Sequence, residues 1–277
     1  MGLRIATNMA SQSVQKNLNE VSSKSQGSLE KLSSGKRINK AADDAAGLAI
    51  ATNLKAQTNG LRQATRNAND GVSMVQTAEG GLNEVSNILV RLRELTIQAS
   101  SDTVGDTERG FLDKEYQQLT TEVDRIADST TFNGTNLLNG EGGGTLDIQV
   151  GAFAGDQNRI QFDSDSTNAT ADEIGVGGTS IADKGDALDA IADIDGAITA
   201  VSGHRANLGS IQSRLQSTVA NLETQTINQD SARSVIEDVD VASETANLAS
   251  SNVVKNAGVA ALAQANQIPN SALRLIG

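Results

Sequence analysis

The chain of 277 residues contains no cysteine and no tryptophan, and its one histidine is His204. Without cysteine, a disulfide framework, a zinc–thiolate cluster and a cysteine nucleophile are all excluded. A single histidine also excludes an H-E-x-x-H site and any other site with several histidine ligands. We therefore expect no metal site, no cofactor and no catalytic residue in this chain.

Aromatic residues and proline are also scarce. The four Phe and one Tyr all lie between Phe111 and Phe162, and the only proline is Pro269. Because aromatic rings carry large buried areas, a chain with so few of them is poorly supplied for a compact globular core. Because proline interrupts helices, its near absence leaves almost the whole chain free to be helical. We therefore expect long, thin helices packed through Ala, Val, Leu and Ile.

Long apolar runs are missing as well. The longest runs, at residues 48–51 and 259–263, fall far short of the roughly 18 residues that suggest a membrane span. Residues 1–6 are followed by polar residues rather than by the apolar core of a signal peptide. The sequence predicts no membrane insertion and no cleavable secretion signal.

Charge is unbalanced, with 22 basic against 34 acidic side chains and a net charge of −12. The first 66 residues are locally basic, but their Lys and Arg are scattered and lack the interleaved aromatic residues that stack on bases. A solvated helix face explains them better, so we expect no nucleic-acid partner. The acidic excess lies between residues 67 and 200, and its part at residues 139–200 is expected to form a surface element that favours solubility.

Glycine gathers in one region, where eleven of the 26 glycines fall between Gly134 and Gly185. Asn133-Gly134 and Asn139-Gly140 are typical turn dipeptides. Beyond them, apolar residues alternate with polar ones in two short runs, which are Leu146, Ile148 and Val150, then Ile160 and Phe162. This alternation predicts a β-hairpin, the one part of the chain without helical character.

Elsewhere the apolar residues recur with the 4-3 spacing of coiled coils. One stripe runs from Leu48 to Ala99, another from Leu112 to Ile126 with Asp106 as N-cap, and a third from Leu188 to Leu222. The predicted fold class is mainly α, with long antiparallel helices forming a coiled-coil or helical bundle and one small β-hairpin region.

The stripes at the two ends of the chain are narrower, being rich in Ala, Ser, Val and Leu and free of aromatic residues, and the second reaches Ile268. Apolar burial contributes about 25 cal/mol per Å², whereas ordering roughly 85 terminal residues costs on the order of 85–170 kcal/mol of backbone entropy. We therefore expect the ends to be weakly ordered in a monomer and to fold when many copies share their stripes. The residues predicted to form this self-assembly core are Val14, Leu18, Val21, Leu29, Leu32, Val239, Ala246, Val253, Ala257, Ala261 and Leu262.

Five segments carry recognisable motifs, namely LSSGKRIN at residues 32–39, AADDAAGLAIA at 41–51, RNANDG at 66–71, SARSVIED at 231–238 and LAQANQ at 262–267. Together these motifs resemble those of bacterial flagellin. The resemblance spans roughly residues 1–140 and 185–277, with the motifs in family order at both ends. It implies an inner coiled-coil domain made from residues 1–44 and 234–277. It also implies a helical rod domain at residues 45–233, with a hairpin and loop insert at about 134–184. Because so few residues separate the two matched regions, we expect the variable outer domains of longer flagellins to be absent.

The resemblance further implies a structural subunit that polymerises into the bacterial flagellar filament, is secreted and serves motility. Its implied partners are other copies of itself, an export chaperone that binds the C-terminal segment, and cap and junction proteins. A hook–filament junction protein of the same architecture remains an alternative, although such proteins usually carry proline in the motif at residues 41–45. A coiled-coil signalling hairpin is the other alternative, and the glycine-rich region speaks against it.

Three residues match positions that contact a flagellin-sensing Toll-like receptor of vertebrates in related flagellins, namely Arg91, Leu95 and Glu115. The competing interpretation is structural: Arg91 and Glu115 pair between neighbouring helices or subunits, and Leu95 packs an interface. For His204 no oriented partner can be named, so we expect a surface or packing role. Asp43 and Asp44 are expected to start a helix, where carboxylates favour the positive end of the dipole.

Overall fold

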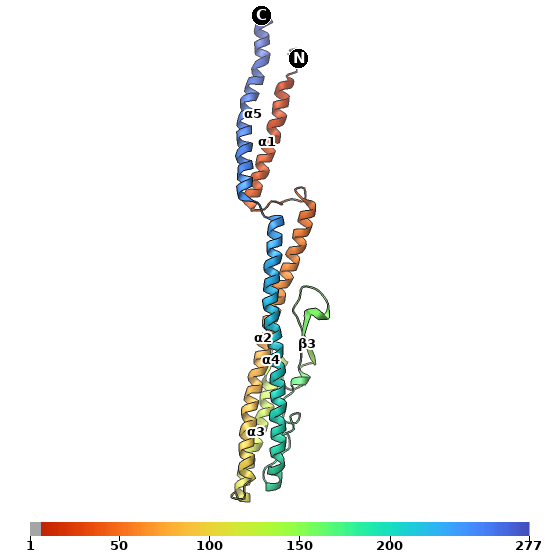
Figure 1. Cartoon of the computed structure of the whole chain (residues 1–277), viewed down its shortest axis with the longest axis vertical. Coiled ribbons are helices and arrows are strands. Elements are labelled where there is room, and N and C mark those ends of the chain that lie inside the picture. The colour runs from red at the N-terminus through yellow and green to blue at the C-terminus, as the bar shows by residue number, and fades with distance from the viewer. Residues whose placement is uncertain (1–6, 277) are drawn as a thin grey trace. The chain divides into compact units, whose positions relative to one another are not determined.

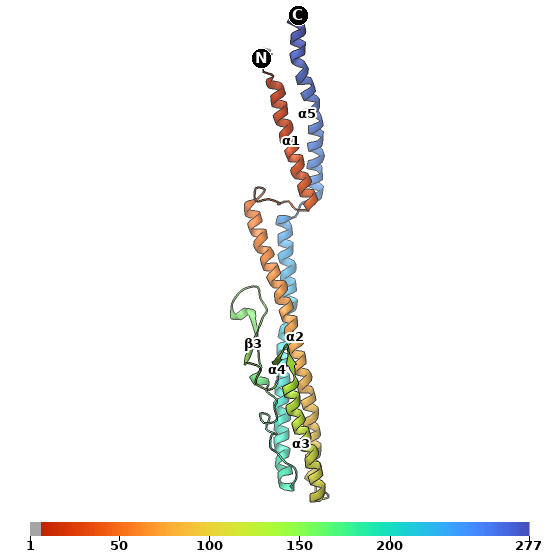
Figure 2. The same ribbon diagram turned by 180° about the vertical axis from the view of Figure 1, so that it is seen from behind.

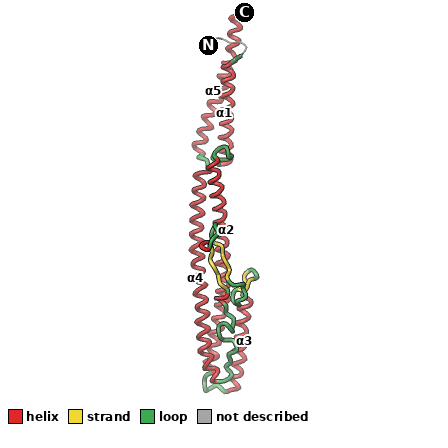
Figure 3. The backbone as a smooth tube through the Cα atoms, turned by 90° about the vertical axis from the view of Figure 1, so that its right-hand side faces the viewer, coloured by secondary structure: helices red, strands yellow, loops and turns green. Residues whose placement is uncertain are grey.

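The structure is a computed structural model that describes residues 7–276, with side chains described as far as residue 267. Residues 1–6 and the side chain of Ile268, for which the sequence carries expectations, lie outside that description. Helices dominate the described chain, and strands occupy short segments (Figure 3), so the prediction of a mainly α fold is confirmed. The helices are α1 (Met9–Ser34), α2 (Ala45–Ala99), α3 (Asp106–Ser129), α4 (Lys184–Glu237) and α5 (Val241–Ile276).

The chain divides into two compact units. Unit 1 is Met1–Ala56 with Asn228–Gly277, and unit 2 is Gln57–Ile227. The boundaries between the units fall inside α2 and α4, whereas the helices themselves break at residues 35–44 and 238–240. The predicted three-part division at 44/45 and 233/234 follows the breaks between helices more closely than it follows the compact units, and it stays a prediction.

Unit 2 contains the main apolar core, between α2, α3 and α4 (Figures 1 and 2). The central stripe of α2 is fully buried there at 3- and 4-residue steps, as the spacing predicts, and α4 faces it with its own buried stripe. One position of the α4 stripe was predicted wrongly: Leu188 is 52% exposed, and Ala187 is buried in its place. The core residues of α2 and α4 include Val75, Ala78, Leu82, Val85, Leu89, Leu92, Ile194, Val201, Leu208 and Leu215.

The predicted β-hairpin is confirmed as an antiparallel pair of strands, β3 (Thr145–Gln149) and β4 (Arg159–Asp163). Leu146 pairs with Phe162 and Ile148 with Ile160, so the apolar residues of both strands share one face. That face packs on α2, where a Cβ added at Gly71 would lie 2.8 Å from Cδ1 of Ile148. Glycine at this position therefore lets the hairpin approach the helix closely.

A second, shorter pair of strands precedes the hairpin, β1 (Thr131–Phe132) and β2 (Thr135–Asn136). Its turn is Asn133-Gly134, with φ of 51° and 78°, the left-handed pair of values that a tight hairpin turn requires. The sequence predicted the turn but no strands around it, because two-residue strands leave no alternation to detect.

The N-cap predicted for α3 is wrong by one residue. Gly105 occupies the cap position, and Asp106 is the first helical residue. The Asp106 carboxylate accepts instead from Arg109 Nη1 at 2.7 Å, and Arg109 also donates to the carbonyl oxygens of Ala99 and Ser101. The Arg109 guanidinium thus closes the turn between α2 and α3. It also binds the Asp106 carboxylate, the group predicted to cap α3.

Candidate functional site

In unit 1, α1 and α5 lie side by side and antiparallel (Figure 1). Near the start of α1, Asn8 Nδ2 donates to the carbonyl of Ala265 at 2.9 Å, and Ser11 Oγ donates to Asn266 Oδ1 at 2.9 Å. Asn8 also caps α1, since its Oδ1 accepts from the backbone N–H of Ser11. Polar contacts therefore hold the start of α1 against α5, in a helix pair that shares only a narrow strip of apolar contact.

Small residues line the contact between the two helices. Ser25 and Ser28 of α1 are 7% and 8% exposed, and Ala265 of α5 is 5% exposed. A Cβ added at Gly258 would lie 3.2 Å from Cδ1 of Leu18, so the helices approach closely there. A hydrogen bond from Ser28 chiefly lowers the pKa of Glu244, which links α5 to α1 through a carboxylate. Small and polar side chains bring the helices together but bury little apolar area.

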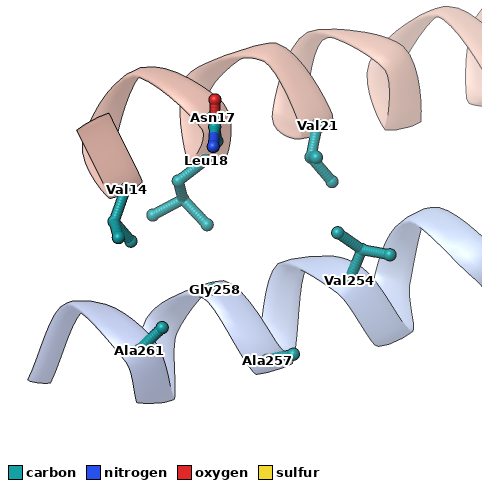
Figure 4. A pocket seen from close by; sticks show the side chains of 8 residues that line it. All are labelled: Val14, Asn17, Leu18, Val21, Val254, Ala257, Gly258 and Ala261. Atoms are coloured by element: carbon teal, nitrogen blue, oxygen red, sulfur yellow. The ribbon is translucent and has the colours of Figure 1, made fainter. Parts of the chain in front are cut away.

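An apolar groove of about 280 Å³ runs between the helices. Val14, Leu18 and Val21 reach from α1 towards α5, whose alanines are too short to fill the space (Figure 4). The groove is therefore open to an apolar group from outside the pair. Its lining residues are Val14, Asn17, Leu18, Val21, Val254, Ala257, Gly258 and Ala261.

The residues predicted to form the self-assembly core fall into two sets, neither of which is buried within the chain. Val14, Leu18, Val21, Leu32, Val239 and Leu262 are half-buried. Leu29 is 53% and Val253 is 68% exposed, and Ala246, Ala257 and Ala261 are also exposed.

The helix α5 thus has two apolar faces. The face with lower exposure carries Leu248, Gly258, Leu262 and Ala265, which keep heptad spacing with Ser251. The other face, which we call the outer face, carries Ala242, Ala246, Ala249 and Val253 of the predicted C-terminal stripe, whereas Ala257 and Ala261 of that stripe line the groove. The sequence pattern does not indicate the first face because glycine and serine interrupt its apolar residues, although their 3-, 4- and 7-residue steps carry the signal.

At the other end of the α1–α5 pair, the segment that joins α1 to α2 contacts the segment that joins α4 to α5. We call the contacting residues, 35–37 and 236–239, the clasp. Gly35, at φ 70°, ends α1 in the left-handed conformation. The backbone N–H of Arg37 donates to the carbonyl of Glu237 at 2.7 Å, and that of Val239 donates to Gly35 at 3.1 Å. The Arg37 guanidinium adds a bond from Nη2 to the carbonyl of Ile236 at 2.7 Å, which satisfies a carbonyl at the end of α4.

Charged groups reinforce the clasp and the start of α2. Lys36 Nζ lies 2.5 Å from Oε1 of Glu237, a side chain that is only 13% exposed. Asp44 Oδ1 accepts from the backbone N–H of Gly47 at 2.8 Å, so the predicted role of this aspartate at a helix start is confirmed. Asp43 holds the preceding turn, and bonds from the backbone N–H groups of Lys40 and Asn39 lower the pKa of its carboxyl.

In unit 2 the structure brings Arg91 and Glu115 together. Arg91 Nη2 lies 2.8 Å from Glu115 Oε1 across α2 and α3, and its Nη1 lies 2.9 Å from Glu94. The bonds to Glu115 and then Glu94 raise the pKa of Arg91. Leu95 is 1% exposed and belongs to the core. The structure therefore shows the Arg91–Glu115 pair between neighbouring helices that the structural interpretation predicts, whereas Leu95 packs in the core of the chain and not at an interface between subunits.

His204 and the acidic residues occupy ordinary surroundings. His204 is half-buried and hydrogen-bonded to the backbone of Ser166. Within the described residues, no three His, Asp or Glu side chains are grouped as a metal site would require. No described helix is both long and apolar enough to cross a membrane.

The functional features of this chain are thus an apolar groove, exposed apolar helix faces and a clasp between distant segments. They define a helical structural protein whose terminal helix pair offers surfaces for association.

Comparison with known families identifies the family of this structural protein. Residues 5–142 match the bacterial flagellin N-terminal helical region, and residues 191–276 match the bacterial flagellin C-terminal helical region. The chain belongs to the bacterial flagellin family.

Full-length relatives support the assignment. The chain is 42% identical to a flagellin of Halalkalibacterium halodurans over 97% of this chain and 98% of the relative. It is 38% identical to a flagellin of Bacillus subtilis over 99% of this chain and 100% of the relative. The protein is a structural subunit of the bacterial flagellar filament and not an enzyme, and the filament it forms by self-polymerisation is extracellular.

Solved structures agree at the level of the fold. The crystal structure of Bacillus cereus flagellin matches with a TM-score of 0.51 and 32% identity, covering 61% of this chain and 94% of that one. A putative flagellar hook-associated protein from Vibrio parahaemolyticus matches with a TM-score of 0.58 over 70% of this chain and 99% of that one. Its identity is 16%, so this second likeness shows a shared fold alone.

Proposed function

We propose that the groove and the outer face of α5 are the surfaces through which neighbouring subunits join in the filament. The observation that carries this proposal is the exposure of three valines on different sides of α5, of which Val254 lines the groove and Val253 lies on the outer face. Val253 is 68%, Val254 is 49% and Val259 is 53% exposed, although valine is among the residues most often buried. Contact with further helices would remove these side chains from water.

Burial of these valines would contribute favourably to assembly. Full burial of a valine side chain contributes about 1.5–3 kcal/mol, so three partly exposed valines supply several kcal/mol per subunit. Leu29 on α1, 53% exposed, adds a further apolar side chain. The open groove is suited to receive such a side chain from a neighbour, as a hole receives a knob in coiled-coil packing.

Replacing Val253 by aspartate tests this proposal. Val253→Asp places a charge on the outer face of α5, where burial without a partner is costly. We expect the purified variant to form no filaments by electron microscopy, while its circular dichroism as a monomer stays unchanged. Val90→Asp is the matched control, because Val90 is a 49% exposed valine on α2 in unit 2. Normal filaments from Val253→Asp would contradict the proposal.

We further propose that the export chaperone covers the same face of α5 before secretion, and that cap and junction proteins meet the equivalent surfaces at the filament ends. An exposed apolar face invites premature association in the cell, so a protein that covers it prevents polymerisation before export. In a pull-down with the flagellar chaperone from the same cells, Val253→Asp should bind more weakly than Val90→Asp. Equal binding of the two variants would mean that the chaperone binds a surface other than this face of α5.

Recognition by a vertebrate flagellin-sensing receptor is the remaining proposal. Arg91 and Glu115 are 49% and 47% exposed in their side chains and can be reached on the surface, whereas Leu95 supports them from the core. We expect Arg91→Ala monomer to signal less than wild type in a receptor reporter-cell assay. Arg125→Ala, which breaks the exposed pair with Glu122 on α3, should signal like wild type. A wild-type monomer without any signal would reject the proposal.

A further inference from the structure

A second, polar pocket lies in unit 2, between α2 and α4. It has a volume of about 340 Å³ and is lined by Gln76, Glu79, Gly80 and Asn83 of α2 and by Arg205 of α4. We propose that this pocket is an intersubunit socket in which Arg205 binds a carboxylate of a neighbouring filament subunit. The inference rests on the filament function, and it adds a contact outside the terminal helices.

The first observation is the state of Arg205. Its Nε is buried and has no hydrogen-bond partner among the described residues. Buried N–H groups of guanidinium side chains are normally bonded, because leaving them unpaired is costly. Glu79 lines the same pocket, yet the structure records no ion pair between it and Arg205. Since its Nε bonds to nothing where it lies, the guanidinium can turn into the pocket without losing a hydrogen bond at that atom.

The second observation concerns Gly80. A Cβ added there would meet no atom within 4 Å, so packing within the chain does not require glycine at this position. Gly81, the next residue, differs, since its added Cβ would lie 2.7 Å from Leu138 and Thr130 side-chain atoms. A helix with glycine at an interior position is less stable than the same helix with alanine there. At Gly80 it leaves an open notch beside Arg205, which a side chain would begin to fill.

The charge of unit 2 indicates which group of a neighbouring copy Arg205 would bind. Unit 2 carries 25 Asp and Glu against 11 Lys and Arg over residues 57–227, so a neighbouring copy presents many more carboxylates than cations. Guanidinium and carboxylate groups match each other in bidentate geometry, and a bond between them is stronger when the contact is partly shielded from water. The side-chain amides of Gln76 and Asn83 offer further hydrogen bonds to the same segment.

Two substitutions test the socket in the full-length protein. Arg205→Gln removes the charge, and Gly80→Ala narrows the notch. We expect Arg205→Gln to raise the critical concentration for polymerisation, measured by sedimentation, by roughly tenfold, the loss typical of a charge-assisted hydrogen bond. Gly80→Ala should raise the critical concentration several-fold while also raising the melting temperature of the monomer, because alanine favours the helix.

The control is Gly196→Ala, at another exposed helical glycine with no atom within 4 Å of an added Cβ. It should raise monomer stability in the same way without changing the critical concentration. If Arg205→Gln and Gly80→Ala polymerise like wild type, the socket is wrong and the filament function stands. If wild type and Gly196→Ala also fail to polymerise under conditions that assemble other flagellins, the filament function itself is overturned.

Discussion

His204 is the one side chain of this protein whose ordinary pKa lies near neutrality. Burial lowers that pKa from 6.5, against opposing effects of the hydrogen bond to the Ser166 backbone and of the Glu173 charge. The imidazole is therefore neutral at pH 7 and ties the loop after β4 to α4. Sequence reasoning could name no partner for His204, because Ser166 lies in an irregular segment far away along the chain.

The lowered pKa predicts how stability depends on pH. As the pH falls below 6.5, the unfolded chain takes up a proton at His204 before the folded chain does, so the free energy of unfolding decreases. The decrease ends once the pH is below the folded-state pKa. His204→Gln should lack this contribution, so thermal melts of the two proteins between about pH 7.5 and about pH 5 should diverge. Parallel melting curves over this range would show that the imidazole does not titrate as its surroundings indicate.

Gly81 illustrates a different constraint, the space available on a helix. Gly81→Ala would place its Cβ 2.7 Å from Cδ1 of Leu138 and from Oγ1 of Thr130. We expect this variant to lower the free energy of unfolding by about 1–3 kcal/mol through overpacking. Urea denaturation measures the change, and Gly110→Ala, at a helical glycine with no atom near an added Cβ, should not be destabilised. A Gly81→Ala variant as stable as wild type would mean that β2 and its flanking residues shift easily.

The clasp shows how two segments some 200 residues apart set the pairing of α1 with α5. Arg37 makes its contacts on the surface, so its side-chain bonds to the Ile236 carbonyl contribute about 1 kcal/mol. Arg37→Ala should therefore reduce hydrogen-exchange protection roughly fivefold in the turns beside the clasp, at residues 31–35 and 241–245. Lys24→Ala, which breaks an exposed pair with Glu20 within α1, should leave that protection unchanged. Equal protection in both variants would show that the backbone bonds of the clasp suffice.

Helices and hairpin differ in how far the sequence predicted them. The stripe of α2 was predictable because apolar residues recur in it at 3-, 4- and 7-residue steps, with Thr58 as the single polar member. The β3–β4 register was predictable in outline, since Leu146 and Ile148 alternate as strongly as Ile160 and Phe162. The orientation of α5 was not, because its face of lower exposure includes Gly258 and Ser251 while its exposed face carries valines. Hydrophobicity alone therefore points to the exposed valines of α5 and not to the face that packs on α1.

The two units differ in how much they bury. In unit 1 the described buried residues are Ser25, Ser28, Ile38, Gly47, Ala51 and Ala265, whereas the core of unit 2 contains most of the large buried side chains. Local stability follows the amount of apolar surface removed from water. The terminal helices thus have little to hold them within a single copy of the chain.

A dilute monomer should therefore show two levels of protection. We expect amides at residues 75–92 of α2 to exchange slowly and amides at residues 12–30 of α1 to exchange faster by orders of magnitude, with both sets protected in filaments. Hydrogen exchange followed by mass spectrometry gives both values from the same sample. Slow exchange of residues 12–30 in the monomer would mean that the α1–α5 pair is stable alone, which the small buried area does not predict.

Every aromatic ring of the protein belongs to unit 2, including Tyr116, whose hydroxyl lies 2.6 Å from that of Thr179. Near-ultraviolet absorbance and intrinsic fluorescence therefore report on unit 2 and do not detect the terminal helices. The natural chain contains no tryptophan and therefore gives no tryptophan absorbance or fluorescence. A single indole introduced on the outer face of α5 would provide an uncontaminated optical signal for each subunit as it joins a growing fibre.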